Sequence, residues 1–281
     1  MDPKRPRRPI LTPEVAKEVL QGSSEVSLDL GLSRSKVARV GDKFNLGGGE
    51  EVLIGDLETI AGRENAAFFV DGPSVFQLAI SGDRYYKLVP TAGAPTLEID
   101  GIRMHRTKGT TPDRDAQEKI EAMGIRGGRV LDTCTGLGYT AAAALERGAE
   151  LVVTIERRPE VLSLAIMNPW SEALFVDKRS HPIIGDAYVQ VDLLPGGFFD
   201  YVVHDPPRLT RAGHLYSSEF YSRLERVMRP GARLLHYTGE PGSKYRRVDL
   251  RRGVMERLRG AGFTDPRYLG HVMGVLCEKP G

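Results

Sequence analysis

The chain has 281 residues, a formal net charge of +2 and 41% hydrophobic residues, values typical of a globular protein with one large domain or two smaller ones. No apolar run approaches the roughly 20 residues that cross a bilayer, and the basic segment 1–13 lacks the apolar stretch of a secretory signal. The two cysteines, Cys134 and Cys277, are too few for a disulfide framework or a zinc site. Composition therefore predicts a cytoplasmic protein with no membrane segment and no metal.

Residues 1–106 are predicted to form a small β-rich domain with a leading helix. The segment 12–22 starts with Thr12 and Pro13 and ends in Gly22, which are typical helix start and stop signals. Short β-rich runs follow, separated by glycine, aspartate or proline, at residues 25–30, 50–57, 66–72, 75–80, 85–90 and 96–106. The stretch 30–41 faintly resembles a helix-turn-helix, but a turn that enters a strand is the commoner explanation.

Residues 107–281 alternate between predicted strands and helices. The predicted strands are 129–133, 151–156, 182–186, 200–205, 233–239 and 271–278, and the helices between them include 139–148, 159–168, 217–228 and 251–262. This alternation predicts a Rossmann-like α/β domain, with a mainly parallel sheet and helices on both faces. The segment 262–279 contains two candidate strands, so we expect it to close the sheet as a hairpin.

Acidic side chains follow three successive predicted strands. Asp132 ends the first strand and is followed by a turn with Gly136 and Gly138, which let a ligand approach the backbone and open a helix N-terminus. Glu156 ends the second strand, where an acid can accept both hydroxyls of a ribose, and Asp186 follows the third, where a carboxylate can accept an adenine amino group. Any one of these acids alone is better explained as a helix cap, but three in register favour a ligand site at the carboxyl ends of the strands.

The loop favours a cationic ligand over a dinucleotide. In "DTCTGLG", Cys134 stands where the dinucleotide fingerprint has its first glycine, and Asp132 precedes the turn. An acid there suits an ammonium group better than a pyrophosphate. S-adenosylmethionine, which carries an amino-acid end, fits this pattern better than NAD.

Over residues 110–279 the sequence resembles class I S-adenosylmethionine-dependent methyltransferases. The stretches "LDTCTGLGYTA", "NPWSEALF", "HDPPR", "LYSSEFY" and "HYTGEPG" look like the predicted archaeal methyltransferases that are distantly akin to spermidine synthases. The resemblance implies that Asp132, Gly136 and Gly138 hold the methionine part of the cofactor, although Cys134 replaces a glycine of the class pattern. The implied cofactor-binding set is Thr111, Asp132, Thr133, Cys134, Thr135, Gly136, Gly138, Tyr139, Glu156, Arg157, Gly185, Asp186 and Ala187.

The fourth strand of the domain ends in the sequence His204-Asp205-Pro206-Pro207-Arg208, which is the predicted catalytic group. It resembles the Asp/Asn/Ser-Pro-Pro-aromatic signature of methyltransferases that modify exocyclic amino groups, with Arg208 in the aromatic place. An aromatic NH₂ is a poor nucleophile because its lone pair is delocalised into the ring. Hydrogen bonds from its two N–H groups to the Asp205 side chain and the Pro206 carbonyl would localise that lone pair, and rigid prolines would fix both acceptors in advance.

Basic residues at 4, 5, 7 and 8 and in the segment 244–260 are typical either of solvated surface or of phosphate contacts to a nucleic acid. The leading hypothesis is an RNA methyltransferase that modifies cytidine N4 or adenosine N6 in ribosomal or transfer RNA. A polyamine-type aminopropyltransferase is the second, but the "GGGDG" loop of those enzymes is missing. The third is a non-catalytic RNA-binding protein, against which the acids and the intact proline motif argue.

Overall fold

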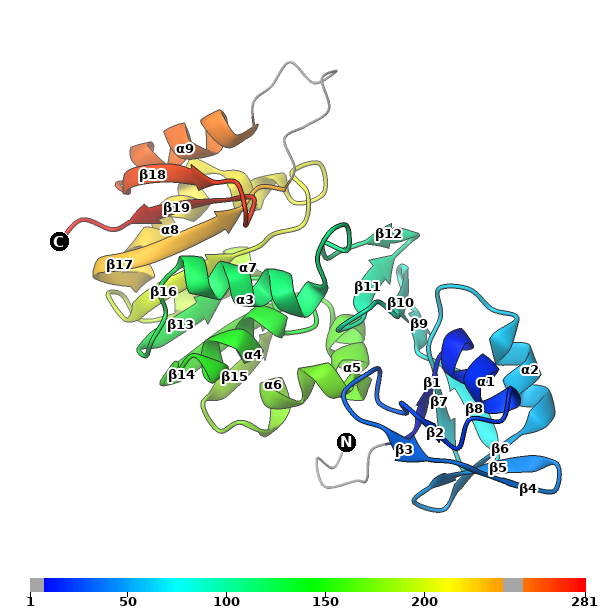
Figure 1. Ribbon diagram of the computed structural model, residues 1–281. Coiled ribbons are helices and arrows are strands. Elements are labelled where there is room, and N and C mark those ends of the chain that lie inside the picture. The colour runs from blue at the N-terminus through cyan, green and yellow to red at the C-terminus, as the bar shows by residue number, and fades with distance from the viewer. Residues whose placement is uncertain (1–7, 240–249) are drawn as a thin grey trace. The chain divides into compact units, whose positions relative to one another are not determined.

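Figure 1 shows the computed structural model of the chain, which describes residues 8–239 and 250–281. The chain forms two compact units. The N-terminal unit comprises Met1–Pro112 with Glu160–Glu172, and the sheet unit comprises Asp113–Pro159 with Ala173–Gly281. The predicted basic contacts at Lys4, Arg5 and Arg7 and at 244–249 lie outside the described residues.

Helix α1 (Pro13–Leu20) starts the N-terminal unit where the sequence predicts it. The Thr12 hydroxyl accepts a hydrogen bond from the Val15 amide at 3.3 Å, and Pro13 lies in the first turn, where a missing amide leaves no bond unmade. Ala16 and Val19 are fully buried in the core that this helix shares with small antiparallel sheets. These sheets are β1 (Ile10–Leu11) with β7 (Phe68–Asp71) and β8 (Ser74–Gln77); β2 (Glu25–Val26) with β3 (Ser35–Lys36); and β4 (Ala38–Val40) with β5 (Lys43–Gly47) and β6 (Glu50–Leu53).

Two predicted strands of this unit are partly wrong. The run 50–57 ends as a strand at Leu53 and continues as helix α2 (Ile54–Ala61), because Leu57 and Ile60 are spaced to bury one helical face. The run 25–30 is a strand only at its first two residues. The stretch 30–41 contains turns and the short strands β3 and β4 instead of a helix-turn-helix. A further antiparallel sheet contains β9 (Ala79–Ser81), β10 (Tyr85–Val89), β11 (Thr96–Ile99) and β12 (Ile102–Arg103).

The sheet unit confirms the predicted Rossmann-like α/β class. Its seven-stranded sheet has the order β15-β14-β13-β16-β17-β19-β18. The strands are β13 (Arg129–Asp132), β14 (Leu151–Glu156), β15 (Ser180–Ile184), β16 (Phe199–His204), β17 (Met228–Tyr237), β18 (Thr264–Leu269) and β19 (Gly274–Glu278). The first five pair in parallel, and β18 and β19 form the expected antiparallel hairpin, although β19 starts three residues later than the predicted strand 271–278.

Helices cover both faces of this sheet, as Figure 1 shows for α3 and α4 on one face and α8 on the other. In chain order the helices of the sheet unit are α3 (Pro112–Ala122), α4 (Tyr139–Glu146), α6 (Glu172–Val176), α7 (Ala187–Gln190), α8 (Ser218–Val227) and α9 (Leu250–Gly260). Helix α5 (Pro159–Met167) falls almost entirely in the N-terminal unit. Short 3₁₀ turns lie at Pro169–Ser171, Val191–Leu193 and Gly213–Tyr216. In the described ranges, no helix is long and apolar enough to span a membrane.

The strand order places a topological switch between β13 and β16. The chain runs from β13 outward to β14 and β15, and then returns to β16 on the other side of β13. Asp132, the last residue of β13, pairs in register with Thr154 on β14 and Val203 on β16. The loops after these strands therefore diverge in opposite directions, and this is the position at which open α/β sheets have a ligand-binding crevice.

The core beneath this crevice depends on aromatic side chains from α8. Phe220 is fully buried, and its ring lies 5.3 Å from the His204 ring and 5.8 Å from the Tyr188 ring, centroid to centroid. The ring thereby supports the end of β16 from the α8 face of the sheet.

Replacing Phe220 with alanine is expected to lower the free energy of unfolding by about 3–5 kcal/mol, because it leaves a cavity under β16. Urea denaturation followed by circular dichroism measures this loss. Ser222→Ala, on the exposed side of the same helix, is the control and should change stability by less than about 0.5 kcal/mol. Equal losses in the two variants would contradict this account of the core.

Candidate active site

The loop after β13 is held from within the protein by Asp132. This residue is fully buried, and its carboxylate accepts hydrogen bonds from the Cys134 amide at 3.2 Å and from the Thr140 hydroxyl at the start of α4. Burial raises the pKa of Asp132 to about 6, while the hydrogen bonds from Thr140 and Cys134 oppose that rise. Asp132 therefore shapes the loop, and the glycines of the loop, Gly136 and Gly138, let a ligand approach its backbone closely.

Gly138 makes the turn from this loop into α4. It has φ +80°, and a Cβ atom there would lie 2.8 Å from Leu174 Cδ2. No side chain caps α4, so the amides of its first turn have no partner within the helix. Such a helix start attracts anionic or electron-rich groups of a ligand.

Glu156 stands at the end of β14 beside the same loop. Its two carboxylate oxygens accept hydrogen bonds from the Gly136 and Arg158 amides, both at 2.9 Å. Burial raises the pKa of Glu156, and the backbone hydrogen bonds oppose that rise. A carboxylate has about four lone-pair positions, so acceptor capacity remains for two further donors such as paired hydroxyls.

Asp186 follows β15 next to Glu156, since the Gly185 amide donates to the Glu156 carbonyl at 2.8 Å. Its side chain caps α7 by accepting a hydrogen bond from the Tyr188 amide at 3.0 Å, and Arg157 lies 3.5 Å from its other oxygen. At Gly185 a Cβ atom would lie 2.6 Å from the side-chain nitrogen Nε2 of Gln190, so a larger residue there would displace the Gln190 side chain. The commonplace explanation of Asp186 as a helix cap is therefore correct, and the residue also lies beside Glu156 at the same edge of the sheet.

Asp205 and the prolines form the lip of the crevice at the end of β16. Pro206 is buried and Pro207 exposed, and the Tyr216 hydroxyl donates to the Pro207 carbonyl at 3.2 Å. Among the residues that the structure describes, no group donates a hydrogen bond to Asp205 Oδ1 or to the Pro206 carbonyl. Asp205 has 27% of its side chain exposed, and its Oδ1 has no hydrogen-bond donor in the described ranges.

The second oxygen of Asp205 binds Lys119, a residue that the sequence analysis missed. Lys119 Nζ lies 2.6 Å from Asp205 Oδ2 and 2.7 Å from Asp115 Oδ2, and the lysine side chain is only 5% exposed. A signal for it exists in the sequence. Lys119 lies on the same helical face as Ala116, Ile120 and Met123, all of which are buried, and a lysine in an apolar stripe requires a buried partner.

His204, which the sequence also predicts to be catalytic, uses both of its ring nitrogens in hydrogen bonds within the protein. It is fully buried, its Nε2–H donates to the Leu215 carbonyl at 2.9 Å, and its Nδ1 accepts from the Thr133 hydroxyl at 2.7 Å. Burial lowers the pKa of His204 to about 4, so the ring is neutral near pH 7. Because both nitrogens are engaged, His204 anchors the lip and is not placed to exchange a proton with a ligand.

The remaining predicted residues divide into interior and surface positions. Thr135 bonds to Thr154, and Ala187 and Tyr139 are buried. Burial and the carboxylates of Glu156 and Asp132 raise the pKa of the Cys134 thiol well above its usual range, so it stays protonated and is a poor nucleophile.

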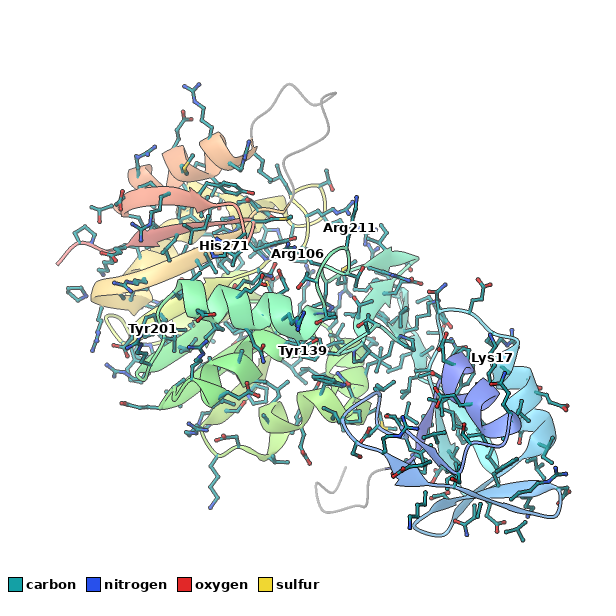
Figure 2. All side chains as sticks on the ribbon, in the orientation of Figure 1. Lys17, Arg106, Tyr139, Tyr201, Arg211 and His271 are labelled. Atoms are coloured by element: carbon teal, nitrogen blue, oxygen red, sulfur yellow. The ribbon has the colours of Figure 1, made fainter. Side chains whose placement is uncertain are left out.

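On the surface, Arg208 and Arg211 are exposed on the loop after the lip, where Figure 2 labels Arg211. Thr111 belongs to the N-terminal unit, so its predicted cofactor contact stays a prediction.

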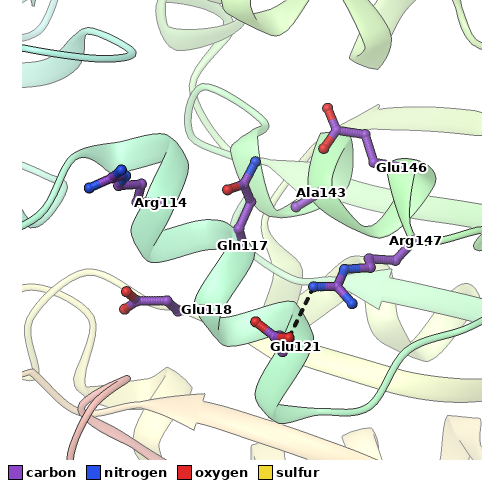
Figure 3. Close-up of a pocket in the computed structure, with 7 residues that line it drawn as sticks. All are labelled: Arg114, Gln117, Glu118, Glu121, Ala143, Glu146 and Arg147. Carbon is purple, nitrogen blue, oxygen red and sulfur yellow. Dashed lines mark ion pairs between the residues drawn. The ribbon is translucent and has the colours of Figure 1, made fainter.

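A separate cavity of about 460 Å³ lies between α3 and α4 on the outside of the sheet unit (Figure 3). Arg147 and Glu121, 3.2 Å apart, form an ion pair across it. None of the acids at the strand ends lines this cavity. Within the described residues, no group of three or more histidine, cysteine or acidic side chains could hold a metal ion.

The sequence has relatives among known proteins. Residues 110–226 match the model of the family described as Conserved hypothetical protein 95. The uncharacterized protein MJ1233 of Methanocaldococcus jannaschii is 48% identical over 280 residues, which cover 96% of this chain and 95% of the relative. Polyamine aminopropyltransferase 2 of Streptomyces coelicolor is 33% identical over 154 residues, but these are 52% of this chain and only 27% of that protein.

Solved structures share the fold. A spermidine synthase in complex with the transition-state analogue AdoDATO has a TM-score of 0.58 at 19% identity, and the match covers 72% of each chain. MnmC2 from Aquifex aeolicus has a TM-score of 0.50 at 18% identity and covers 71% of each chain. At these identities the likeness shows that the fold is the one used by these two proteins.

Thr133→Val tests the anchor under the lip. The change removes the hydroxyl that His204 Nδ1 accepts from and leaves a buried nitrogen without a partner, which should lower the free energy of unfolding by about 1–3 kcal/mol. Urea denaturation measures the loss, and Thr264→Val on the exposed edge strand β18 is the matched control. A loss no greater than that of the control would show that the anchor contributes nothing to stability.

Proposed function

We propose that this chain, which belongs to the protein family that includes MJ1233 of Methanocaldococcus jannaschii, is an S-adenosylmethionine-dependent methyltransferase that acts on an exocyclic amino group of a base in RNA. The observation that carries the proposal is the lip at the end of β16. Among residues 8–239 and 250–281, neither Asp205 Oδ1 nor the Pro206 carbonyl receives a hydrogen bond, and the two prolines stiffen the backbone between them. They match the two N–H groups of a planar aromatic amine.

The strand-end groups fit S-adenosylmethionine. The glycine loop 132–138 lets the methionine part approach the backbone, Glu156 is placed to accept from ribose hydroxyls, and Asp186 next to it suits the adenine amino group. Arg157, exposed beside Asp186, lines the same end of the site. When bound, the cofactor would supply a methyl group bonded to a positively charged sulfur. As an electron-rich nitrogen bonds to the methyl carbon, the carbon–sulfur bond would break and the sulfur would leave as a neutral thioether.

The residues at the lip then act on the acceptor. By accepting both N–H bonds, Asp205 and the Pro206 carbonyl orient the nitrogen lone pair away from the lip and raise its electron density. Because the prolines fix the backbone beforehand, little reorganisation accompanies the reaction. The methylated nitrogen carries an extra, acidic proton, which leaves to Asp205 or to water without a stronger base.

The RNA partner is supported by charge on the rim of the site. Arg208 and Arg211 are exposed on the loop that follows the lip, and in the described part of the chain no acidic side chain pairs with either. Free guanidinium groups there suit phosphates or stack on a base. We include the N-terminal domain, residues 1–106, as an RNA contact, and ribosomal or transfer RNA as the target, with cytidine N4 or adenosine N6 as the methylated atom.

A polyamine-type aminopropyltransferase is the second candidate, since the similarity to Streptomyces coelicolor polyamine aminopropyltransferase 2 covers about half of this chain. Calorimetry with S-adenosylmethionine and with its decarboxylated form separates the two candidates. We expect tighter binding of the carboxylated form. A preference for the decarboxylated form would favour aminopropyl transfer and count against methylation.

Asp205→Asn should reduce methyl transfer at least about 100-fold, because one acceptor oxygen becomes a donor that opposes the amine. The measurement is transfer of tritium from labelled cofactor into RNA of a strain that lacks this protein. Cofactor affinity should stay within about threefold, since the lip binds the acceptor. Asp265→Asn, a carboxylate with 76% of its side chain exposed on β18, is the control. Full activity in Asp205→Asn would exclude the proposed role of the lip.

Cofactor affinity should fall as the pH drops through about 6. The pKa of Asp132 is raised to about 6, so below that pH the carboxyl gains a proton and loses an acceptor position that holds the loop. Above pH 6 the affinity should be constant. Asp132→Asn should bind weakly at every pH and lose this dependence, as titration calorimetry between pH 5 and 8 would show. An unchanged pH dependence in the variant would assign the titration to another group.

A further inference from the structure

Helix α3 places the charged side chain of Lys119 in the interior of the sheet unit. Lys119 lies on the apolar face of α3 and is surrounded by partners: Asp115 Oδ2 at 2.7 Å, Asp205 Oδ2 at 2.6 Å and the Tyr237 ring centroid at 4.1 Å. The two carboxylates raise the pKa of the lysine further than burial lowers it, so the ammonium group stays charged. A buried lysine with this set of partners is costly to place and is held in one position.

This cation acts on Asp205 from one side only. It occupies Oδ2 and leaves Oδ1 without a hydrogen-bond donor among the described residues. The ion pair therefore fixes the orientation of the Asp205 carboxylate about its Cβ–Cγ bond. Lys119 on α3 binds one oxygen, and the other oxygen remains available to a ligand.

We propose that Lys119 is a positioning residue for the methyl transfer, which orients Asp205 as an anion and selects a neutral amine over an ammonium ion as the acceptor. The inference rests on the function proposed above. An amine that reaches Asp205 Oδ1 comes within a few ångströms of the Lys119 charge, because both oxygens belong to one carboxylate. Lys119 therefore weakens the attraction that the Asp205 carboxylate would otherwise have for a protonated polyamine, whereas an uncharged base amine loses nothing by its presence.

The charged and titratable groups around Asp205 have opposite effects on its pKa. Burial raises the pKa of Asp205 and Lys119 lowers it. Asp115 also raises this pKa, but its effect is smaller than that of Lys119. From the other elements packed around the lip, Asp132 on β13, Cys134 in its loop, Tyr216 before α8 and Tyr237 on β17 face the same space. Removal of Lys119 should therefore raise the pKa of Asp205, whereas removal of the Asp115 charge should lower it.

Lys119→Met and Asp115→Asn test this pair of opposite shifts. In protein with ¹³C-labelled aspartate, carboxyl NMR follows the titration of Asp205, whose signal is identified by its loss in Asp205→Asn. We expect the midpoint to rise by at least about one pH unit in Lys119→Met and to fall in Asp115→Asn. Lys279→Met, a lysine paired with Glu225 at the far end of the sheet, is the control and should not move it. A midpoint that is unmoved in Lys119→Met overturns the proposal.

Methyl transfer gives a second readout that a merely structural role would not move. In Lys119→Met the acid limb of the kcat profile should shift to higher pH, kcat should fall at least about tenfold, and cofactor affinity should be retained. Lys119→Arg should restore most of kcat, because it keeps the charge. If Lys119→Met does not fold, Lys119→Gln provides a neutral side chain that can still donate a hydrogen bond, with the same expected shifts.

Calorimetry with spermidine, used as a polycationic probe, tests the selection of a neutral amine. Spermidine should bind Lys119→Met at least about tenfold more tightly than the unaltered protein, and equal affinities would overturn this part. The failures are distinguishable. If the unaltered protein methylates no RNA while the Asp205 midpoint still shifts in Lys119→Met, the proposed function fails and the positioning by Lys119 stands. If RNA is methylated but the midpoint does not shift, the inference about Lys119 fails alone.

Discussion

The site depends on one constraint: neighbouring parallel strands end at the same edge of the sheet. Because β13, β14 and β16 pair in register, the acids that follow them share one partly buried space. Carboxylates are costly to bury, and each here has a compensating partner of a different kind. Asp132 accepts from an amide and a hydroxyl, Glu156 from two amides, and Asp205 from a lysine. The type of partner determines how much of each carboxylate remains open.

The rigidity of the lip has a separate origin in the core below it. His204 is tied to Thr133 on one side and to the Leu215 carbonyl on the other, and Phe220 packs beneath its ring. The chain then enters two prolines, whose fixed φ values prevent the lip from relaxing. A buried neutral histidine thus contributes to the proposed chemistry by fixing where Asp205 stands, and not by moving a proton.

Under the proposed function the site has a donor side and an acceptor side. Spermidine synthase and MnmC2 share only the fold with this chain, so the comparison does not distinguish the two sides. In the proposed function the acceptor side comprises the proline lip, the buried Lys119 and the exposed arginines Arg208 and Arg211. These features select the charge and shape of the acceptor molecule. We therefore use them to choose between an RNA base and a polyamine as the acceptor.

The sequence by itself determined the order of strands and helices in the sheet unit, the closing hairpin and the acids at the strand ends. Local signals carry these features, since alternation, glycine turns and proline motifs are read over a few residues. It misjudged residues 54–61, where a helix continues directly from a strand without a side-chain cap to mark the boundary. Only the tertiary structure decided that His204 is a buried anchor and that Lys119 holds Asp205, 86 residues away in the chain. Such pairs depend on which helix packs over which strand, and no local pattern records that choice.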